Sequence, residues 1–541
     1  MTELKDHIVE SFLKLVKENK SFPTTSEFVK YDISRDQIRK EFGSSLLLKK
    51  YIIENHASEV GEVLATVLDV FNSDRNADNV KHDYKRFIIT TAVASSPVHK
   101  GFMAALDNYA ERKSAKVIIM PCESKTNSFN DETAVFDPIF SDPKYVFVQG
   151  DTAICSNLSL CSIQVSANQT KPITGLARLG KRSGSYVFAS PKQFLEYYPN
   201  GNIKGRNYAI MTPGACTRPH YFTENFVSKR LAYIGEADHT IGAIIVEVED
   251  DGIHFHFRQI QGAEDGSFID LGINYLPNGS IEKVKASIVL GDIHGVNANV
   301  EAITSMAMTL AANDIEVENL FLHDLFDGAS INHHEQTIGS AAKRHYHKAS
   351  SLRDELEETF KLLVSMRDMF EPGHVFVVKS NHDEFLDRYL KEGRYIKDPE
   401  NYYTALKIAV AEHEGHDPLE YGMFHFGFRV PHDETVMEHD VTFLDRNDSV
   451  KIAGIELGAH GDLGYNGAKP SLNSMEITYG KCVIGHNHSG AIQRGVFRVG
   501  TMSNLDLKYN RGPSSWTPTN AIVYGNGQVQ LLNYVNGKYF A

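Results

Sequence analysis

The stretch Ser287-Ile-Val-Leu-Gly-Asp-Ile-His-Gly295 is the most informative part of the chain. It is an apolar run that ends at a glycine, after which Asp292 and His294 stand two residues apart. Residues i and i+2 of an extended chain point to the same side, so the carboxylate and the imidazole should lie together. Open α/β sheets keep their ligand sites at the carboxyl ends of strands. The stretch therefore predicts a functional site that needs further partners.

The same pattern recurs four more times in the C-terminal half of the chain. The four clusters are His323-Asp324-x-x-Asp327 after strand 317–322, Ser380-Asn381-His382-Asp383 after strand 375–378, His460-Gly461 after strand 452–457, and Gly485-His486-x-His488 after strand 482–484. A single histidine at a strand end is more often structural than a ligand, but five clusters within about 200 residues are hard to attribute to chance. We expect them to converge, because neighbouring strands of an α/β sheet bring their ends together.

The residue types in these clusters favour a site for divalent metal ions. Carboxylate and amide oxygens with imidazole nitrogens suit Mn²⁺, Fe²⁺ and Zn²⁺. No cysteine falls in the clusters, which argues against a structural zinc site. Two ions roughly 3.5–4 Å apart can clamp the attacking and leaving oxygens of a displacement at phosphorus. A nearby histidine can then protonate the leaving oxygen.

In their order and strand-end positions, the five clusters resemble the signature of calcineurin-like metallophosphoesterases, over residues 285 to 500. The resemblance implies an α/β fold, a β-sandwich flanked by helices, with a dinuclear centre at one edge. It implies His382 as the catalytic histidine and Asp327 as the carboxylate that orients it. The implied ligands are Asp292, His294 and His488 for one ion, Asn381, His460 and His486 for the other, and Asp324 as the bridge.

Three positions depart from the pattern of the family. The family usually has glycine where this chain has His323 and Ser380, and we interpret both as local backbone changes. Gly328 stands where the serine/threonine phosphatase branch has an arginine that binds phosphate. The absence of this arginine weakens the interpretation of the chain as a protein phosphatase.

The segment 329–350 follows the bridging-aspartate cluster and is rich in basic and imidazole side chains, among them Lys343 and Arg344. It is either a contact surface for a polyanionic substrate or an ordinary solvated loop. The first interpretation favours a DNase that uses Mn²⁺, with Fe²⁺ or Zn²⁺ as alternatives, similar to nucleases of the SbcD type. In length and order the chain also resembles the pre-early host-DNA-degradation protein of large siphophages. The alternatives are a phosphomonoesterase or protein phosphatase with an N-terminal partner-selection region, and a DNA-binding protein with a relic site.

The N-terminal half is predicted to form two further domains, so that the chain divides at 1–85, 86–280 and 281–541. Residues 1–85 read as short helices that resemble a helix-turn-helix module, with Arg35, Arg39 and Lys40 as candidate DNA contacts. The alternative is a helical accessory or oligomerisation domain with a solvated charged face. In the middle segment, strands 87–93 and 116–120 around helix 101–113 predict a parallel βαβ unit.

Composition limits the possible classes of protein. A net charge of −14 argues against a protein that coats nucleic acid by charge alone. It does not exclude a nuclease, because bound cations invert the local field. The sequence has no apolar run long enough to span a membrane and no basic, apolar N-terminal leader, and its five cysteines lack CxxC spacing. We expect a cytoplasmic protein, in the host cytoplasm if it is phage-encoded, that binds no membrane and could form a homo-oligomer.

Overall fold

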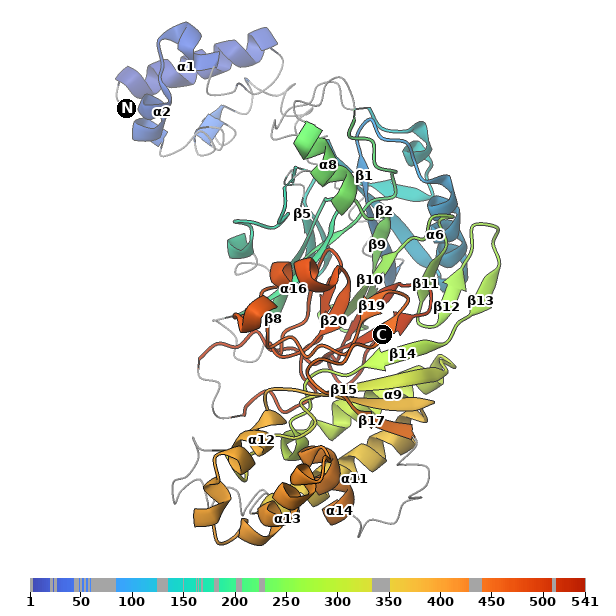
Figure 1. Ribbon diagram of the computed structural model, residues 1–541. Coiled ribbons are helices and arrows are strands. Elements are labelled where there is room, and N and C mark those ends of the chain that lie inside the picture. The colour runs from blue at the N-terminus through green and yellow to red at the C-terminus, as the bar shows by residue number, and fades with distance from the viewer. Residues whose placement is uncertain are drawn as a thin grey trace. The chain divides into compact units, whose positions relative to one another are not determined.

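The computed structural model (Figure 1) divides into two compact units, residues 1–83 and 84–541, which are described separately. The described residues are 3–19, 27–42, 84–123, 135–148, 150–161, 169–179, 184–200, 207–222, 229–332, 351–427, 440–507 and 512–540, with single positions between 23 and 59 and between 163 and 166.

The first unit is helical, with α1 (Glu3–Asn19), η1 (Glu27–Tyr31) and α2 (Arg35–Phe42). Its core collects apolar residues at helical spacing on α1, among them Ile8 and Phe12, against residues of η1 and α2. The apolar segment 46–53 lies largely outside the described residues. The side chains of Arg39 and Lys40 are exposed, while that of Arg35 is not described. Their contact with DNA stays a prediction.

The second unit begins with a five-stranded sheet in the order β10-β9-β1-β2-β3. Strands β1 and β2 pair in parallel on either side of α6, which confirms the predicted βαβ unit. A small antiparallel sheet, β11-β12-β13, follows it in the chain. The bounds are β1 (Arg86–Val93), α6 (Lys100–Lys113), β2 (Ala115–Cys122), η3 (Pro138–Ser141), β3 (Tyr145–Phe147), β9 (Gly242–Val248), β10 (Phe255–Gln261), β11 (Phe268–Asp270), β12 (Ile273–Tyr275) and β13 (Ile281–Lys283).

A six-stranded sheet in the order β17-β16-β15-β14-β23-β24 carries the first three clusters. Strands β14 to β17 are parallel, β23 pairs antiparallel with β14, and β24 pairs antiparallel with β23. Alternate residues of β14, β15 and β16 belong to one hydrophobic core with α9, α11 and α14 (Figure 1). The bounds are β14 (Ala286–Val289), η4 (Gly295–Asn297), α9 (Val300–Ala312), β15 (Val317–His323), α11 (Leu352–Phe370), β16 (His374–Val378), α12 (Glu384–Lys391), η6 (Arg394–Lys397), α13 (Tyr402–His413), α14 (Pro418–Gly427), β17 (Val441–Phe443), β23 (Thr519–Tyr524) and β24 (Val529–Asn533).

A ten-stranded sheet in the order β18-β19-β20-β22-β21-β7-β8-β6-β5-β4 carries the last two clusters. It joins strands from both sides of residue 280, through the antiparallel pair β7–β21, so the domain division at that residue stays a prediction. The bounds of these strands, and of the helices α8, η7 and α16 in the same parts of the chain, are β4 (Thr152–Cys155), β5 (Leu158–Cys161), β6 (Ser185–Phe188), β7 (Gln193–Pro199), β8 (Asn207–Pro213), α8 (Lys229–Asp238), β18 (Lys451–Ile452), β19 (Ile455–Glu456), η7 (Tyr465–Gly467), α16 (Leu472–Tyr479), β20 (Cys482–Ile484), β21 (Ala491–Gln493) and β22 (Val496–Arg498).

The single strand predicted at 452–457 is wrong. The segment is a tight antiparallel hairpin of β18 and β19, in which Lys451 pairs with Glu456. Ala453 and Gly454 lie between the two strands with φ angles of 49° and 81°, so the chain reverses there instead of continuing extended. An apolar run alone does not reveal a turn of this kind, because alanine is an unusual residue at positive φ.

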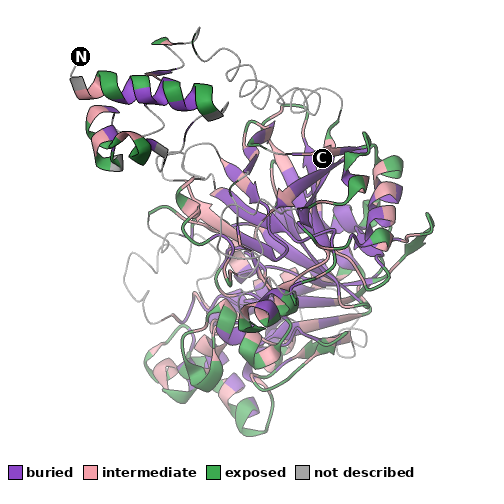
Figure 2. Ribbon diagram, turned by 90° about the horizontal axis from the view of Figure 1, so that it is seen from above, coloured by how far each residue is buried: buried purple, intermediate pink, exposed green. Residues whose placement is uncertain are grey.

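The second unit is a mixed α/β structure whose sheets are largely buried (Figure 2). Helices α9 and α11 alternate buried and exposed positions, as expected for helices that cover a sheet. Among the described residues, no helix is long and apolar enough to cross a membrane.

Candidate metal centre

The five strand-end clusters converge, but from two sheets rather than one. Asp292, Asp324 and Asn381 follow β14, β15 and β16 of the six-stranded sheet, whereas His460 and His486 follow β19 and β20 of the ten-stranded sheet. The segment 499–503 joins the two sheets beside the site. It follows β22, and its Gly500 carbonyl accepts a hydrogen bond from the Asp292 backbone N–H at 3.1 Å.

One group of four side chains places its ligand atoms within 4.8 Å of one another: Asp292, His294, Asp324 and His488. The His294 and His488 Nε2 atoms are 3.0 Å apart, and His488 Nε2 is 3.2 Å from Asp292 Oδ2. His294 Nε2 is 3.6 Å from Asp324 Oδ2. All four residues are buried. Such a set of carboxylate oxygens and imidazole nitrogens could hold a divalent metal ion.

A second group forms on the other side of Asp324. Its Oδ1 atom is 3.5 Å from His460 Nε2, whereas its Oδ2 atom faces His294. His486 Nδ1 lies 3.1 Å from Asn381 Oδ1, and the rings of His460 and His486 are 5.4 Å apart, edge to face. The carboxylate of Asp324 therefore lies between two groups of ligand-capable atoms.

Several buried polar atoms of these groups have no hydrogen-bond partner among the described residues. They are both carboxylate oxygens of Asp292, Oδ1 of Asp324, Nε2 of His460 and Nδ1 of His488. A buried polar group that is left unpaired costs about 1–3 kcal/mol, and more when it is charged. A cation bound among the carboxylate oxygens and His460 Nε2 would satisfy four of these five atoms. The residues present thus fit a metal ion.

Burial prepares the histidines to act as neutral ligands. It lowers the pKa of His488 to about 3, that of His460 well below its usual value, and that of His486 to a lesser degree. Burial together with the charge of Asp324 raises the pKa of Asp292 well above its usual value. The ligand atoms of Asp292 and Asp324 lie within 4.8 Å of each other, so the two carboxylates repel when both are charged. A divalent cation between them would relieve that repulsion.

His382 and Asp327 lie at the edge of the first group. Asp327 Oδ1 contacts His294 Nδ1 at 2.9 Å and His382 Nδ1 at 3.2 Å, and the Asp327 carbonyl oxygen is also 3.0 Å from His382 Nδ1. Burial opposes protonation of His382, but the charge of Asp324 and the contact with Asp327 raise its pKa to about 10. The side chain of His382 is 18% exposed, so a substrate could reach it.

The backbone of the site adopts conformations that side chains rarely take. His294, Asp324, His486 and His488 have φ angles of 57°, 47°, 71° and 55°. A residue other than glycine in this left-handed region costs of order 1–3 kcal/mol, and such strain clusters at functional sites. Gly485 is needed for a different reason, because a Cβ atom there would lie 2.2 Å from Asp292 Oδ1.

The chain is similar to Protein A1 of Escherichia phage T5. The two are 31% identical over 483 residues, which covers 84% of this chain and 83% of Protein A1. The chain belongs to the Protein A1 family. No protein-family model and no solved structure matches it. The name Protein A1 states no activity. The two groups of ligand-capable side chains around Asp324 are therefore the main indication of the chemistry of this family member.

In this member of the Protein A1 family, three residues that the sequence did not single out as functional touch the site. His323 was interpreted as a local backbone change, but its buried ring places Nδ1 3.2 Å from His460 Nδ1. Asn297 Nδ2 donates to Asp327 Oδ2 at 3.0 Å. The ring of Trp516 lies 4.2 Å from that of His488, edge to face. The histidine in place of the usual glycine was the one available signal.

The predicted substrate contacts are not among the residues that the structure brings together. Lys343 and Arg344 lie in the segment 333–350, outside the described residues. Arg35, Arg39 and Lys40 belong to the first unit, whose placement relative to the second is not determined. Their roles in substrate binding stay predictions.

Proposed function

We propose that this member of the Protein A1 family is a metal-dependent phosphodiesterase that hydrolyses DNA. The observation that carries the proposal is the carboxylate of Asp324, whose two oxygens face two separate groups of ligand-capable atoms. That arrangement suits a carboxylate that bridges two ions in a phosphoester hydrolase. The order of the five clusters and their origin from two sheets also support a calcineurin-like metallophosphoesterase fold.

In this proposal, Asp292, His294 and His488 hold one divalent ion and Asn381, His460 and His486 hold the other. Mn²⁺ is the first choice, with Fe²⁺ or Zn²⁺ as alternatives, because the donor set mixes oxygens with imidazole nitrogens and contains no sulfur. Bound ions would neutralise charge on the phosphate and supply an activated water as the nucleophile.

The chain's own residues would orient the phosphodiester and supply the proton for its leaving group. His382 is partly exposed and its contact with the Asp327 carboxylate favours the protonated imidazole, so it can give a proton to the leaving oxygen. Asp327 fixes the imidazole through its carboxylate and its backbone carbonyl. His294 contacts the same carboxylate, which couples the position of His382 to the ligand group.

A DNA substrate is favoured over a phosphoprotein by the surroundings of Gly328. This residue has a φ of 69°, and a Cβ atom there would lie 2.8 Å from Cδ2 of Phe385. The position therefore has no room for the phosphate-binding arginine of serine/threonine phosphatases. The relative is encoded by a phage, and we propose that this chain acts in the host cytoplasm, where it would degrade host DNA in the manner of SbcD-type nucleases.

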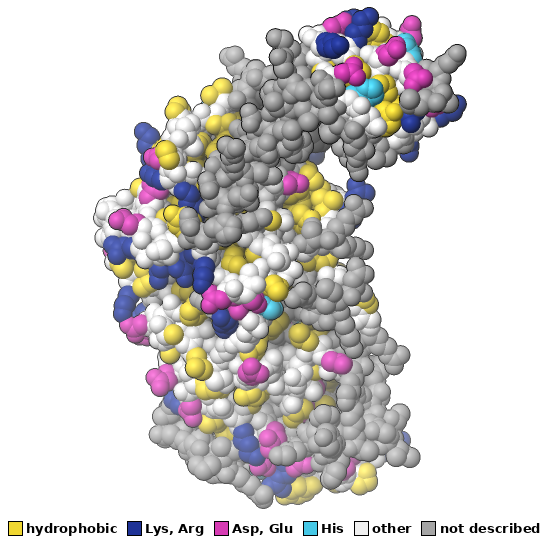
Figure 3. Space-filling model, turned by 180° about the vertical axis from the view of Figure 1, so that it is seen from behind, with side chains coloured by type: hydrophobic (Ala, Val, Ile, Leu, Met, Phe, Trp, Pro, Cys, Tyr) yellow, Lys and Arg dark blue, Asp and Glu magenta, His cyan; other side chains and the backbone are white. Residues whose placement is uncertain are grey.

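The face of the molecule shown in Figure 3 has no broad basic surface for DNA among its described residues. On the face shown in Figure 3, Lys and Arg side chains lie interspersed with Asp and Glu. The whole chain carries a net charge of −14. Binding of a polyanion would therefore depend strongly on the bound cations, which invert the local field.

The test is incubation of the purified chain with linear, circular and single-stranded DNA in the presence of Mn²⁺ or Mg²⁺. We expect cleavage that EDTA stops and that exceeds the hydrolysis of 4-nitrophenyl phosphate. Hydrolysis of the small phosphomonoester or of a phosphopeptide, without any DNA cleavage, would replace the proposal with a phosphomonoesterase or protein phosphatase.

Replacing Gly485 by alanine should weaken metal binding. The added methyl group would force Asp292 away from its position, since it would meet Oδ1 at 2.2 Å. We expect the affinity for Mn²⁺ to fall by about 10–100-fold, as for other changes beside a metal ligand. Isothermal titration calorimetry measures the effect. The matched control is Gly525→Ala, in the β23–β24 turn, where a Cβ atom meets nothing within 4 Å. Equal affinities for the two variants would contradict the prediction.

A further inference from the structure

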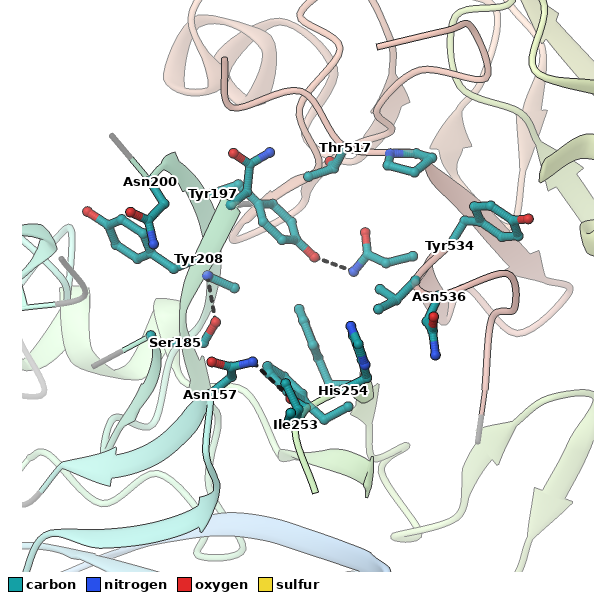
Figure 4. A pocket seen from close by; sticks show the side chains of 18 of the residues that line it. Asn157, Ser185, Tyr197, Asn200, Tyr208, Ile253, His254, Thr517, Tyr534 and Asn536 are labelled. Carbon is teal, nitrogen blue, oxygen red and sulfur yellow. Dashed lines mark hydrogen bonds between the residues drawn. The ribbon is translucent and has the colours of Figure 1, made fainter. Parts of the chain in front are cut away.

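A cavity of about 820 Å³ opens beside the candidate metal centre (Figure 4). Its volume lies within the range of about 300–1,000 Å³ that is usual for small-molecule sites. Its walls come from β6, β7 and β8 of the ten-stranded sheet, from the start of β10, and from segments 516–518 and 533–536. Figure 4 shows Tyr197, Asn157, Tyr534 and Asn536 around it, on elements far apart in the sequence.

One wall of the cavity touches the metal centre directly. Trp516 lines the cavity, and its ring lies 4.2 Å from the ring of His488. The next residue, Thr517, donates its backbone N–H to the His488 carbonyl oxygen at 2.9 Å. Asn207, across the cavity, donates its side-chain amide to the Trp516 carbonyl oxygen at 2.7 Å. A molecule in the cavity would therefore contact Trp516, whose ring packs on the imidazole of His488.

The lining combines aromatic faces with neutral amides. Phe255 and Phe257 lie with ring centroids 6.1 Å apart at 29°, and Tyr197 lies 6.3 Å from Phe257. The amides of Asn157 and Asn207 also line the cavity. Aromatic faces stack on nucleic-acid bases of any sequence. Asparagine side chains offer both a donor and an acceptor to the edge of a base.

The charge of the lining side chains indicates whether the base or the phosphate of a nucleotide fits the cavity. No Lys, Arg, Asp or Glu is found among its lining residues in the described part of the chain. The charge-assisted hydrogen bonds that bind a phosphate most strongly come from Arg and Lys, so this uncharged, aromatic lining favours a neutral heterocycle over a phosphate. The phosphodiester would instead go to the neighbouring metal centre.

We propose that this cavity receives an unpaired base of the DNA strand whose phosphodiester lies at the metal centre. The inference rests on the proposed function, and it deepens that function by naming the substrate class. A base inside a duplex is stacked and paired, so it can enter the cavity only from single-stranded or frayed DNA. The chain is thus selective for unpaired DNA.

The test uses the fluorescence of Trp516, the only tryptophan in the chain. The full chain is titrated with Mn²⁺ present, by rapid mixing before cleavage proceeds, with a single-stranded deoxyoligonucleotide and with an abasic strand of equal length. We expect the emission to change with the first strand, and its affinity to exceed that of the abasic strand by about 5- to 150-fold, the range for stacking of one base. Free deoxynucleosides should shift the emission, whereas deoxyribose 5-phosphate should not.

Phe255→Ala should remove most of the preference for the strand that carries bases. The matched control is Tyr403→Ala, an aromatic residue on α13 that is 62% exposed and lies outside the cavity lining. Equal affinity of the wild-type chain for both strands, with no emission change on adding nucleosides, would overturn the inference, even if DNA is cleaved. Base-dependent binding without Mn²⁺-dependent cleavage would instead overturn the proposed function and leave the cavity assignment standing.

Discussion

Replacing Asp324 by asparagine is expected to lower the rate of DNA cleavage by at least about 10³-fold, since electrostatic stabilisation at a reacting centre accounts for effects of this size. The carboxylate oxygens face His460 on one side and His294 on the other. An amide keeps the shape but gives up the negative charge and turns an NH₂ group toward one of the two ligand groups. Bound metal should fall together with activity.

The matched control for this variant is Asp368→Asn, the same change at a side chain on α11 that is 66% exposed. It should retain both metal and activity. Cleavage rates come from a gel assay at saturating DNA, and bound metal from elemental analysis of the same samples. If Asp324→Asn cleaved DNA at the wild-type rate with a full complement of metal, Asp324 would not bridge two ions.

Replacing His382 by alanine should separate catalysis from metal binding. The proposed ligand groups do not include His382, so bound metal should remain unchanged. Loss of the proton donor should slow DNA cleavage by about 10²–10⁴-fold, the usual contribution of general acid catalysis. The exposed His413→Ala, at the end of α13, is the matched control and should behave as wild type.

A substrate with a better leaving group distinguishes this role of His382 from a structural one. Bis(4-nitrophenyl) phosphate releases a phenolate that needs no proton, so its hydrolysis should suffer much less in His382→Ala than DNA cleavage does. An equal loss on both substrates would mean that His382 positions the phosphate or the metal. Loss of bound metal in His382→Ala would mean that His382 is a metal ligand.

The strand-end clusters were predictable from the sequence because each is a local pattern. An apolar run that stops at a carboxylate or an imidazole is visible within ten residues, and β14, β15 and β16 end beside Asp292, Asp324 and Asn381 as expected. The parallel pairing of β1 with β2 was predictable for the same reason, since the two strands flank a single amphipathic helix.

The pairing of strands that are far apart in the sequence could not be predicted. In the ten-stranded sheet β7 pairs with β21, so that Leu195 lies opposite Ile492, and no local pattern encodes that partner. For this reason the local patterns did not indicate which distant strands supply the site, or that Trp516 packs on His488. The hairpin at 452–457 was missed because Ala453, a residue compatible with a strand, takes a positive φ.

His323 shows how a departure from a family pattern can be misread. The sequence marked it as a histidine in place of glycine, and the simplest interpretation was a change in the backbone. Its buried ring instead contacts His460, and burial lowers the pKa of His323 to about 4. A neutral imidazole there can accept the Nδ1 proton of His460, which would leave His460 Nε2 free to face Asp324.

The measurement that tests the central claim most directly is a titration of the metal-free chain with Mn²⁺, in which bound ions and DNA cleavage are determined in the same samples. The account predicts that about two ions bind per chain, and that cleavage rises to its maximum as the second ion binds. Cleavage that reaches its maximum with fewer than one bound ion per chain, or two bound ions without any cleavage, would contradict it.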